Sequence, residues 1–164
     1  MITLSDLRFG AEARNRIAES KSPEPEGFLA ALESFYYALA HQDAAVLAEV
    51  WSEDDLAQLN NPLGGILRGG EAIVDLYRRI FSSRARLDVE FGDFVQYLGV
   101  DHALVAGRES GSYTVDGSEP VELSIRTSRY FRYDSSRGRW LQFHHHGSID
   151  APQALAAYQA AILG

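Results

Sequence analysis

Three consecutive histidines, His144 to His146, form the most chemically distinctive run in this sequence. Imidazole titrates near neutral pH, so a well-placed histidine can act as a general acid or base. Adjacent side chains of a β-strand point to opposite faces, so His144 and His146 are the two that can act on one molecule. Two imidazoles without a third ligand make a weak metal site, and no metal is expected. A catalytic pair and a pair of hydrogen-bonded core histidines both fit this run.

One arginine interrupts an apolar row. Alternate positions of a predicted strand carry Leu123, Ile125, Arg129 and Phe131. A charge on an apolar face needs a partner of opposite sign. Two interpretations stay open. Arg129 forms an ion pair with Glu109, or it faces a cavity and binds an anionic ligand there.

Proton transfer of the isomerase type needs a carboxylate base and hydrogen-bond donors for the developing enolate. Candidate donors are Tyr36, Tyr77, Tyr113 and Tyr130, and candidate bases are Asp75, Asp93 and Glu109. No spacing singles out one pair. The absence of cysteine excludes a thiol nucleophile and a thiolate metal site. No phosphate-binding glycine loop precedes a helix, so nucleotide binding is not expected, and no G-x-S-x-G nucleophile elbow occurs. No cofactor is expected.

Composition narrows the possible partners. A length of 164 residues suits one domain, and an apolar content of 46% is enough for its core. The net charge of −8, with Lys21 as the single lysine, argues against nucleic-acid binding. No apolar run is long enough to span a membrane, and the N-terminus does not resemble a signal peptide. We therefore expect no membrane partner and a cytoplasmic location.

The periodicity of apolar residues predicts the elements that position these side chains. Residues 1–25 form an N-terminal arm and linker, with a weak helical pattern over residues 1–20. Helices are predicted near residues 26–41, 43–50 and 70–82, with a short strand near residues 56–59. The period then changes to two, which predicts long strands near residues 86–98, 101–113, 119–133 and 138–149. Pro152 opens a final helix over residues 151–163, so that residues 26–164 make a single domain.

Short turns between long strands predict an antiparallel meander, and helices that precede it predict an α+β fold. The last strand carries Gly138-Arg139-Trp140 followed by His144, His146 and Ser148. This pattern resembles a motif of SnoaL-like proteins and of the association domain of calcium/calmodulin-dependent kinase II. Two further stretches, residues 127–131 and 61–69, are similar to other segments of the nuclear transport factor 2-like superfamily, which includes ketosteroid-isomerase-like proteins. The resemblance covers roughly residues 28–150.

The resemblance implies a cone-shaped fold, in which N-terminal helices pack on a strongly curved antiparallel sheet and enclose a cavity. It places Trp140, Gln142, His144, His146 and Ser148 on the inner face of the last strand. Gln142 stands where an aliphatic residue is expected. The opposite face would carry Leu141 and Phe143 outward, which predicts a homodimer through the outer face of the sheet.

Members of this superfamily include isomerases, cyclases, dehydratases and oligomerisation modules, so the fold does not specify a reaction. We expect a domain that binds a small, partly apolar molecule, for which an anion is one alternative, in a cavity lined by His144, His146 and Arg129. Further candidate ligand-binding residues are Tyr77, Glu109, Trp140 and Asn61. The alternative is an isomerase or dehydratase that acts by proton transfer on a small enolisable substrate, with His144 and His146 as catalytic residues.

Overall fold

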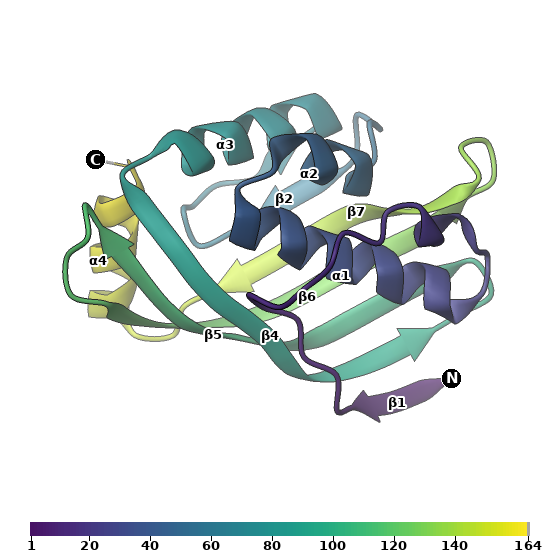
Figure 1. Ribbon diagram of the computed structural model, residues 1–164, viewed down its shortest axis with the longest axis horizontal. Helices are drawn as coiled ribbons and strands as arrows, with labels where there is room; N and C mark the ends of the chain where they lie inside the picture. Colours follow the sequence, from purple (N-terminus) through teal and green to yellow (C-terminus); the bar gives the residue numbers. More distant parts are fainter. Residues whose placement is uncertain (164) are drawn as a thin grey trace.

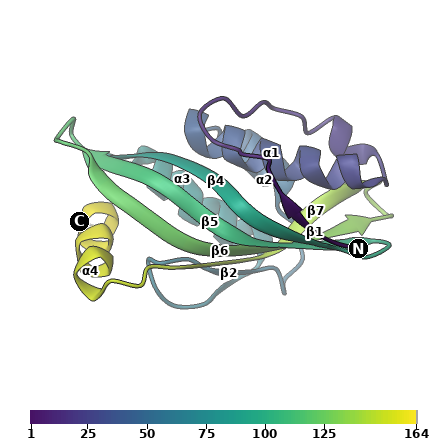
Figure 2. The same cartoon turned by 90° about the horizontal axis from the view of Figure 1, so that it is seen from below.

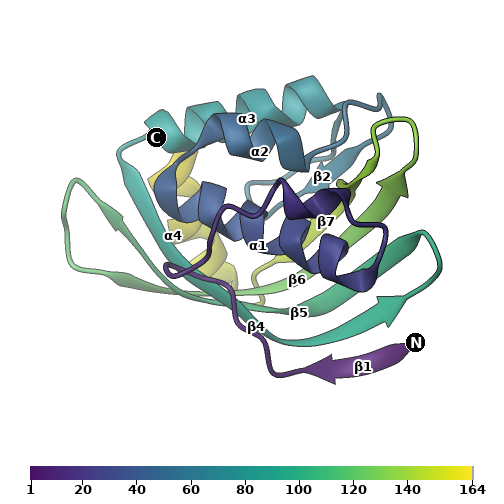
Figure 3. The same cartoon turned by 45° about the vertical axis from the view of Figure 1, so that its right-hand side comes forward.

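The structure is a computed structural model, and it describes residues 1–163. Within these residues, four α-helices pack against a seven-stranded sheet of order β1-β4-β5-β6-β7-β2-β3. The paired strands are antiparallel except β2 and β7, which run parallel. The sheet curves around α1, as Figures 1 and 3 show. The predicted α+β class and cone-shaped architecture are confirmed.

The four long strands match the prediction to within a few residues at each end. They are β4 (Ala85–Leu98), β5 (His102–Val115), β6 (Val121–Asp134) and β7 (Arg139–Ser148). Each pairs with the next in an antiparallel meander, because only short turns connect them. Two short strands, β2 (Gln58–Asn60) and β3 (Leu67–Arg68), extend the sheet beyond β7.

The first three helices begin in three different ways. Helix α1 (Pro25–His41) has proline in its first turn, where no backbone N–H is required. Helix α2 (Ala44–Val50) is capped by Asp43, whose side chain accepts hydrogen bonds from two backbone N–H groups. Helix α3 (Gly70–Ser82) begins against the carbonyl of Ser52, and a Cβ on Gly70 would lie 2.0 Å from that oxygen.

The N-terminal arm is bound to the domain. Residues Ile2–Ser5 form β1 and pair with β4, so the helical pattern predicted for residues 1–20 is wrong there. Phe9 pairs its backbone with Phe91, and a short 3-10 turn (Glu19–Lys21) precedes α1. Glu33 on α1 accepts hydrogen bonds from Arg14 and Arg16. Tertiary contacts of this kind override a weak local helical preference.

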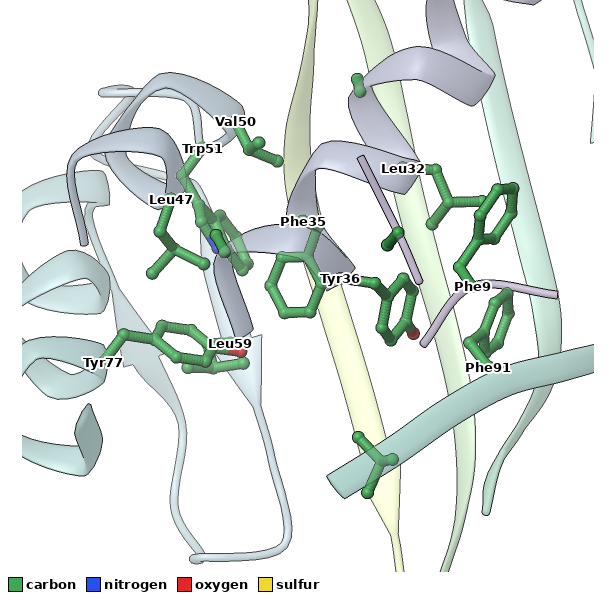
Figure 4. Packing of buried hydrophobic residues seen from close by; sticks show 14 of the residues in the cluster. Phe9, Leu32, Phe35, Tyr36, Leu47, Val50, Trp51, Leu59, Tyr77 and Phe91 are labelled. Atoms are coloured by element: carbon green, nitrogen blue, oxygen red, sulfur yellow. The ribbon is translucent and has the colours of Figure 1, made fainter. Parts of the chain in front are cut away.

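Aromatic side chains fill the space between α1 and the sheet. Figure 4 shows Tyr36 of α1 beside Phe9 and Phe91, and Phe35 between Tyr36 and Tyr77. The rings of Tyr36 and Phe91 are stacked with centroids 5.4 Å apart. The same region of α1 therefore holds the arm, the sheet and α3 together.

Helix α4 (Pro152–Leu163) lies at the end of the sheet away from β1, apart from α1 and α2 (Figures 1 and 2). Its Tyr158 and Ile162 are buried, and the ring of Tyr158 packs edge-on against Tyr113 of β5, with centroids 5.6 Å apart. None of the helices in residues 1–163 is long and apolar enough to cross a membrane.

Candidate functional site

Strand β7 does not keep the alternation that the sequence predicts. Phe131 of β6 pairs with Gln142, while the preceding residue, Tyr130, pairs with His144. Phe143 is therefore an extra residue on β7, which makes this position a β-bulge. A bulge of one residue exchanges the two faces for every residue that follows it.

The bulge changes which histidine faces the interior. His145 is buried, whereas His144 is half-buried and His146 is exposed. The Nδ1 atom of His144 lies 3.1 Å from the carbonyl oxygen of Gln58 at the edge of β2. The prediction that His144 and His146 share the inner face with Trp140 is therefore wrong, although Trp140 itself is buried as expected.

Trp140 lies away from the other candidate residues. Its indole Nε1 donates a hydrogen bond of 3.0 Å to the carbonyl of Ser22, and its ring packs against Phe28 near the start of α1. Trp140 thus binds the linker before α1 to the sheet, and it does not line the cavity described below.

Arg129 of β6 points inward and forms an ion pair with Glu109 of β5. The Nη2 to Oε1 distance is 2.8 Å, and the two side chains are 0% and 6% exposed. The guanidinium carbon also lies 3.7 Å from the centre of the Phe35 ring, a cation–π arrangement. Of the two interpretations offered by the sequence, the ion pair is confirmed.

Two further side chains complete the hydrogen bonding of this pair. Tyr36 donates its hydroxyl hydrogen to Glu109 Oε1 at 2.7 Å and accepts from Arg129 Nε at 3.0 Å. Gln142 accepts from Arg129 Nη1 at 3.1 Å. Within residues 1–163, no donor forms a hydrogen bond with the second oxygen of Glu109, Oε2.

His145 lies directly opposite Arg129 in the β6–β7 ladder. Its Nδ1 is 3.5 Å from the hydroxyl of Tyr77 on α3, and its Nε2 is buried without a partner in the described chain. Burial and, to a smaller degree, the charge of Arg129 lower the pKa of His145 well below its ordinary value. Burial also raises the pKa of Tyr77. At neutral pH the pair is therefore a neutral imidazole beside a neutral phenol.

These polar groups border a small, largely apolar cavity of about 40 Å³. Its walls come from α1, α3, α4, the sheet and the loop after β2. The polar or charged lining residues are Asn61, Tyr77, Glu109, Arg129, His145 and Tyr158. The apolar lining residues include Phe35, Leu39, Ile80, Leu87, Leu123 and Ile125.

The structure thus brings four predicted site residues to one cavity, namely Arg129, Tyr77, Glu109 and Asn61. Asn61 also fixes its own loop, because its Oδ1 accepts a hydrogen bond from the backbone N–H of Leu63. In residues 1–163, no group of three histidine or acidic side chains is placed to hold a metal ion.

Sequence reasoning did not name His145, Gln142 or Tyr158 as functional residues, although it placed Gln142 on the inner face of the last strand. The sequence did contain a clue for Gln142, because a polar side chain stands where an aliphatic one is expected. In the structure it accepts a hydrogen bond from Arg129. For His145 the missing information was the bulge at Phe143. For Tyr158 it was the docking of α4, which local periodicity does not reveal.

The charges of the site nearly cancel. The guanidinium of Arg129 directs Nε, Nη1 and Nη2 to Tyr36, Gln142 and Glu109, so its charge is already compensated. A second anion in the cavity would be repelled by the Glu109 carboxylate in a medium of low dielectric constant. The arrangement therefore offers hydrogen-bond acceptors and an apolar wall, and it does not favour an anionic ligand.

Known proteins that are similar to this chain share its fold. A family model described as SnoaL-like domain matches residues 29–152. None of the curated proteins matches the chain. A solved structure described as a putative calcium/calmodulin-dependent protein kinase type II association domain from Thiobacillus denitrificans is 26% identical, with a TM-score of 0.60, and the match covers 79% of this chain and 97% of that one.

Two more distant structures share the fold. One is described as a putative dehydratase from the NTF2-like family of Streptomyces avermitilis, with 21% identity, a TM-score of 0.62 and coverage of 74% and 91%. The other is a ketosteroid isomerase-like protein from Erwinia carotovora, with 17% identity, a TM-score of 0.63 and coverage of 76% and 95%. At these identities the likeness concerns architecture.

Proposed function

The chain belongs to the SnoaL-like domain family, and from that premise we propose that it binds a small, mainly apolar molecule in the cavity between the sheet and helices α1, α3 and α4. The observation that carries this proposal is the convergence of a few polar groups on an otherwise apolar cavity. Ligand sites of proteins have this composition, with polar groups that fix the orientation of the ligand.

The polar groups also indicate the charge of the ligand. Because Glu109 already neutralises Arg129, the site suits a neutral molecule better than the anion considered from the sequence. Glu109 Oε2 and the His145–Tyr77 pair remain as hydrogen-bonding groups at the cavity. A ligand with one hydrogen-bond donor, such as a hydroxyl group, would complement them.

The cavity is too small for an aromatic ligand unless one of the elements that line it moves on binding. About 40 Å³ holds a few water molecules, whereas a cavity that takes up benzene has roughly 150 Å³. Ligand binding therefore needs an outward displacement of at least one element.

A fluorescent probe tests this proposal in the full-length chain. 1-Aminoanthracene is neutral and apolar, and its emission rises when it leaves water. We expect saturable binding that the variant Leu123→Trp weakens at least about tenfold, because the larger side chain fills the cavity. Leu104→Trp, at a half-buried position of β5 that does not line the cavity, is the matched control. Equal binding by both variants and the unmodified protein would contradict the proposal.

A second candidate function is proton transfer, as in an isomerase or dehydratase. The observation that favours it is the position of the His145 imidazole, which lies beside Tyr77 and shares the cavity with Glu109. Such a group can accept a proton from carbon next to a carbonyl while a phenol donates to the enolate oxygen. This assignment replaces His144 and His146 with His145.

Hydrogen–deuterium exchange into 2-butanone, followed by NMR, tests this activity without knowledge of the substrate. Catalysed exchange should fall by about 10²-fold or more in His145→Ala, since general-base catalysis contributes 10²–10⁴. His146→Ala is the control, because this side chain is exposed. Exchange no faster than in buffer of the same pH would exclude enolisation of this ketone.

The outer face of the sheet supports the proposal of a homodimer, although of the two residues predicted for it only Phe143 is partly exposed. Leu141 is only 2% exposed and is not available to a partner. Exposed apolar side chains on this face belong instead to β1 and β4, where Ile2, Leu4 and Tyr97 are 72%, 66% and 42% exposed. A contiguous apolar face of this kind is typical of an interface.

We expect the partner at this face to be another copy of this chain. The 26% identical structure is described as an association domain, which supports that choice. Light scattering after size-exclusion chromatography should give twice the monomer mass, and Tyr97→Arg should give the monomer. Val100→Arg, at an exposed hairpin tip, is the control. A monomeric unmodified protein would exclude the dimer.

A further inference from the structure

Helix α4 is held to the domain by few interactions. In the described chain, the side-chain hydrogen bond that joins α4 to another element runs from Gln159 Nε2 to the carbonyl of Pro62, at 3.0 Å. Only Tyr158 and Ile162 of this helix are buried. A 12-residue helix is marginally stable in water by itself. Docking and folding of α4 are therefore coupled, and undocking it removes Tyr158 and Ile162 from the core.

Tyr158 occupies the place where this weakly held helix meets the cavity. Its side chain lines the same cavity as Glu109, His145 and Tyr77, and its ring packs against Tyr113. Within residues 1–163, its hydroxyl forms no hydrogen bond. Burial, followed by the charge of Glu109, raises the pKa of Tyr158, so the side chain is a neutral phenol at neutral pH.

A tyrosine side chain is a neutral ring with one hydroxyl group. It thus has the properties that the cavity requires of a ligand, namely apolar area, no charge and a hydrogen-bond donor. Removal of this side chain would also enlarge a cavity that is at present too small for an aromatic ring.

We propose that Tyr158 is a built-in plug which the ligand replaces, and that the ligand is a neutral molecule with an aromatic ring and a hydroxyl group. This inference rests on the proposed binding function. Binding then requires that α4 undocks, so the apparent affinity of the unmodified protein is reduced by the small fraction of molecules in which the helix is open.

Toluene and two of its para-substituted derivatives test the plug in the full-length chain. The probe p-cresol is the tyrosine side chain itself, toluene lacks the hydroxyl, and 4-methylbenzoate replaces it with a charge. By calorimetry, Tyr158→Ala should bind p-cresol at least about tenfold more tightly than the unmodified protein. Toluene should bind Tyr158→Ala more weakly than p-cresol, and 4-methylbenzoate more weakly still. Gln153→Ala, at an exposed position of α4, should behave like the unmodified protein.

The outcomes separate this inference from the function on which it rests. If p-cresol binds Tyr158→Ala no better than the unmodified protein while 1-aminoanthracene still binds, the plug is excluded and the binding function stands. If toluene or 4-methylbenzoate binds as tightly as p-cresol, the ligand class is wrong. If neither p-cresol nor 1-aminoanthracene binds any form of the protein, the binding function itself fails.

A measurement on the unmodified protein covers the case in which Tyr158→Ala does not fold. At saturating p-cresol, amide hydrogens of α4 should exchange faster than in the free protein, because the helix is displaced. Amides of β5 and β6 should exchange no faster. Protection of α4 by p-cresol would overturn the inference, since a plug cannot be stabilised by the ligand that replaces it.

Discussion

Arg129 and Glu109 form a buried ion pair between neighbouring strands, although they are not opposite each other in the ladder. Arg129 lies opposite Val105, and Glu109 lies opposite Ile125, so the arginine side chain extends along the sheet to reach the carboxylate. The pair is therefore held by side-chain length and by Tyr36, which bonds to both partners.

Removal of one partner of this pair should be costly, because it leaves a buried charge uncompensated. For Glu109→Leu we expect a loss of about 3–5 kcal/mol in the free energy of unfolding, measured by urea denaturation. The double variant Glu109→Leu/Arg129→Met should recover most of that loss. As control, Glu90→Leu removes an exposed ion pair with Arg8 and should change stability by less than about 1 kcal/mol. Equal losses in the single and double variants would show that the charges are not coupled.

The hydroxyl of Tyr36 should contribute to stability through both of its hydrogen bonds. Tyr36→Phe keeps the ring stacking but leaves the buried Nε of Arg129 without an acceptor. We expect a loss of about 1–3 kcal/mol by urea denaturation. Tyr133→Phe is the control, since its hydroxyl bonds to Lys21 at an exposed position and should matter less. A loss for Tyr36→Phe no larger than that of the control would contradict the assigned network.

Stability should fall as the pH drops below about 6.5, the ordinary pKa of histidine. Burial keeps the pKa of His145 well below that value in the folded protein, so the unfolded state binds more protons in this range. The free energy of unfolding then decreases with falling pH, by at most about 1.4 kcal/mol per pH unit for this one group.

Urea denaturation between pH 7.5 and 5.5 measures this effect, and His145→Gln should reduce the slope. His146→Gln, at an exposed position of the same strand, is the matched substitution for comparison. His144, whose pKa burial also lowers, should contribute a smaller part. An identical slope in His145→Gln and the unmodified protein would refute the neutral buried imidazole.

The N-terminal arm should detach when its aromatic anchor is removed. Phe9 is buried, and its ring lies 6.4 Å from that of Tyr36 and 6.2 Å from that of Phe94. Phe9→Ala should cost about 3–5 kcal/mol, the usual range for a buried phenylalanine. Limited proteolysis should then cleave within residues 1–24. Leu7→Ala, at an exposed position, should leave the arm resistant.

The histidine run shows how far pattern alone can go. Alternation predicted that His144 and His146 share one face, and they do lie on the same side of β7. The prediction that this side faces the interior was wrong, because Phe143 is an extra residue in the strand. A bulge of this kind leaves no mark in the hydrophobic pattern. The ion pair of Arg129 was more accessible to sequence reasoning, since a charge in an apolar row requires a partner.

The sequence by itself determined the α+β class, the four long strands and the helices that precede them, because periodicity and turn chemistry are local properties of the chain. It also determined that Arg129 needs compensation. Tertiary structure decided that β1 joins the sheet and that His145 and Tyr158 line the cavity. Each of these depends on contacts between residues far apart in the chain, whose energies outweigh local preference and which no local pattern encodes.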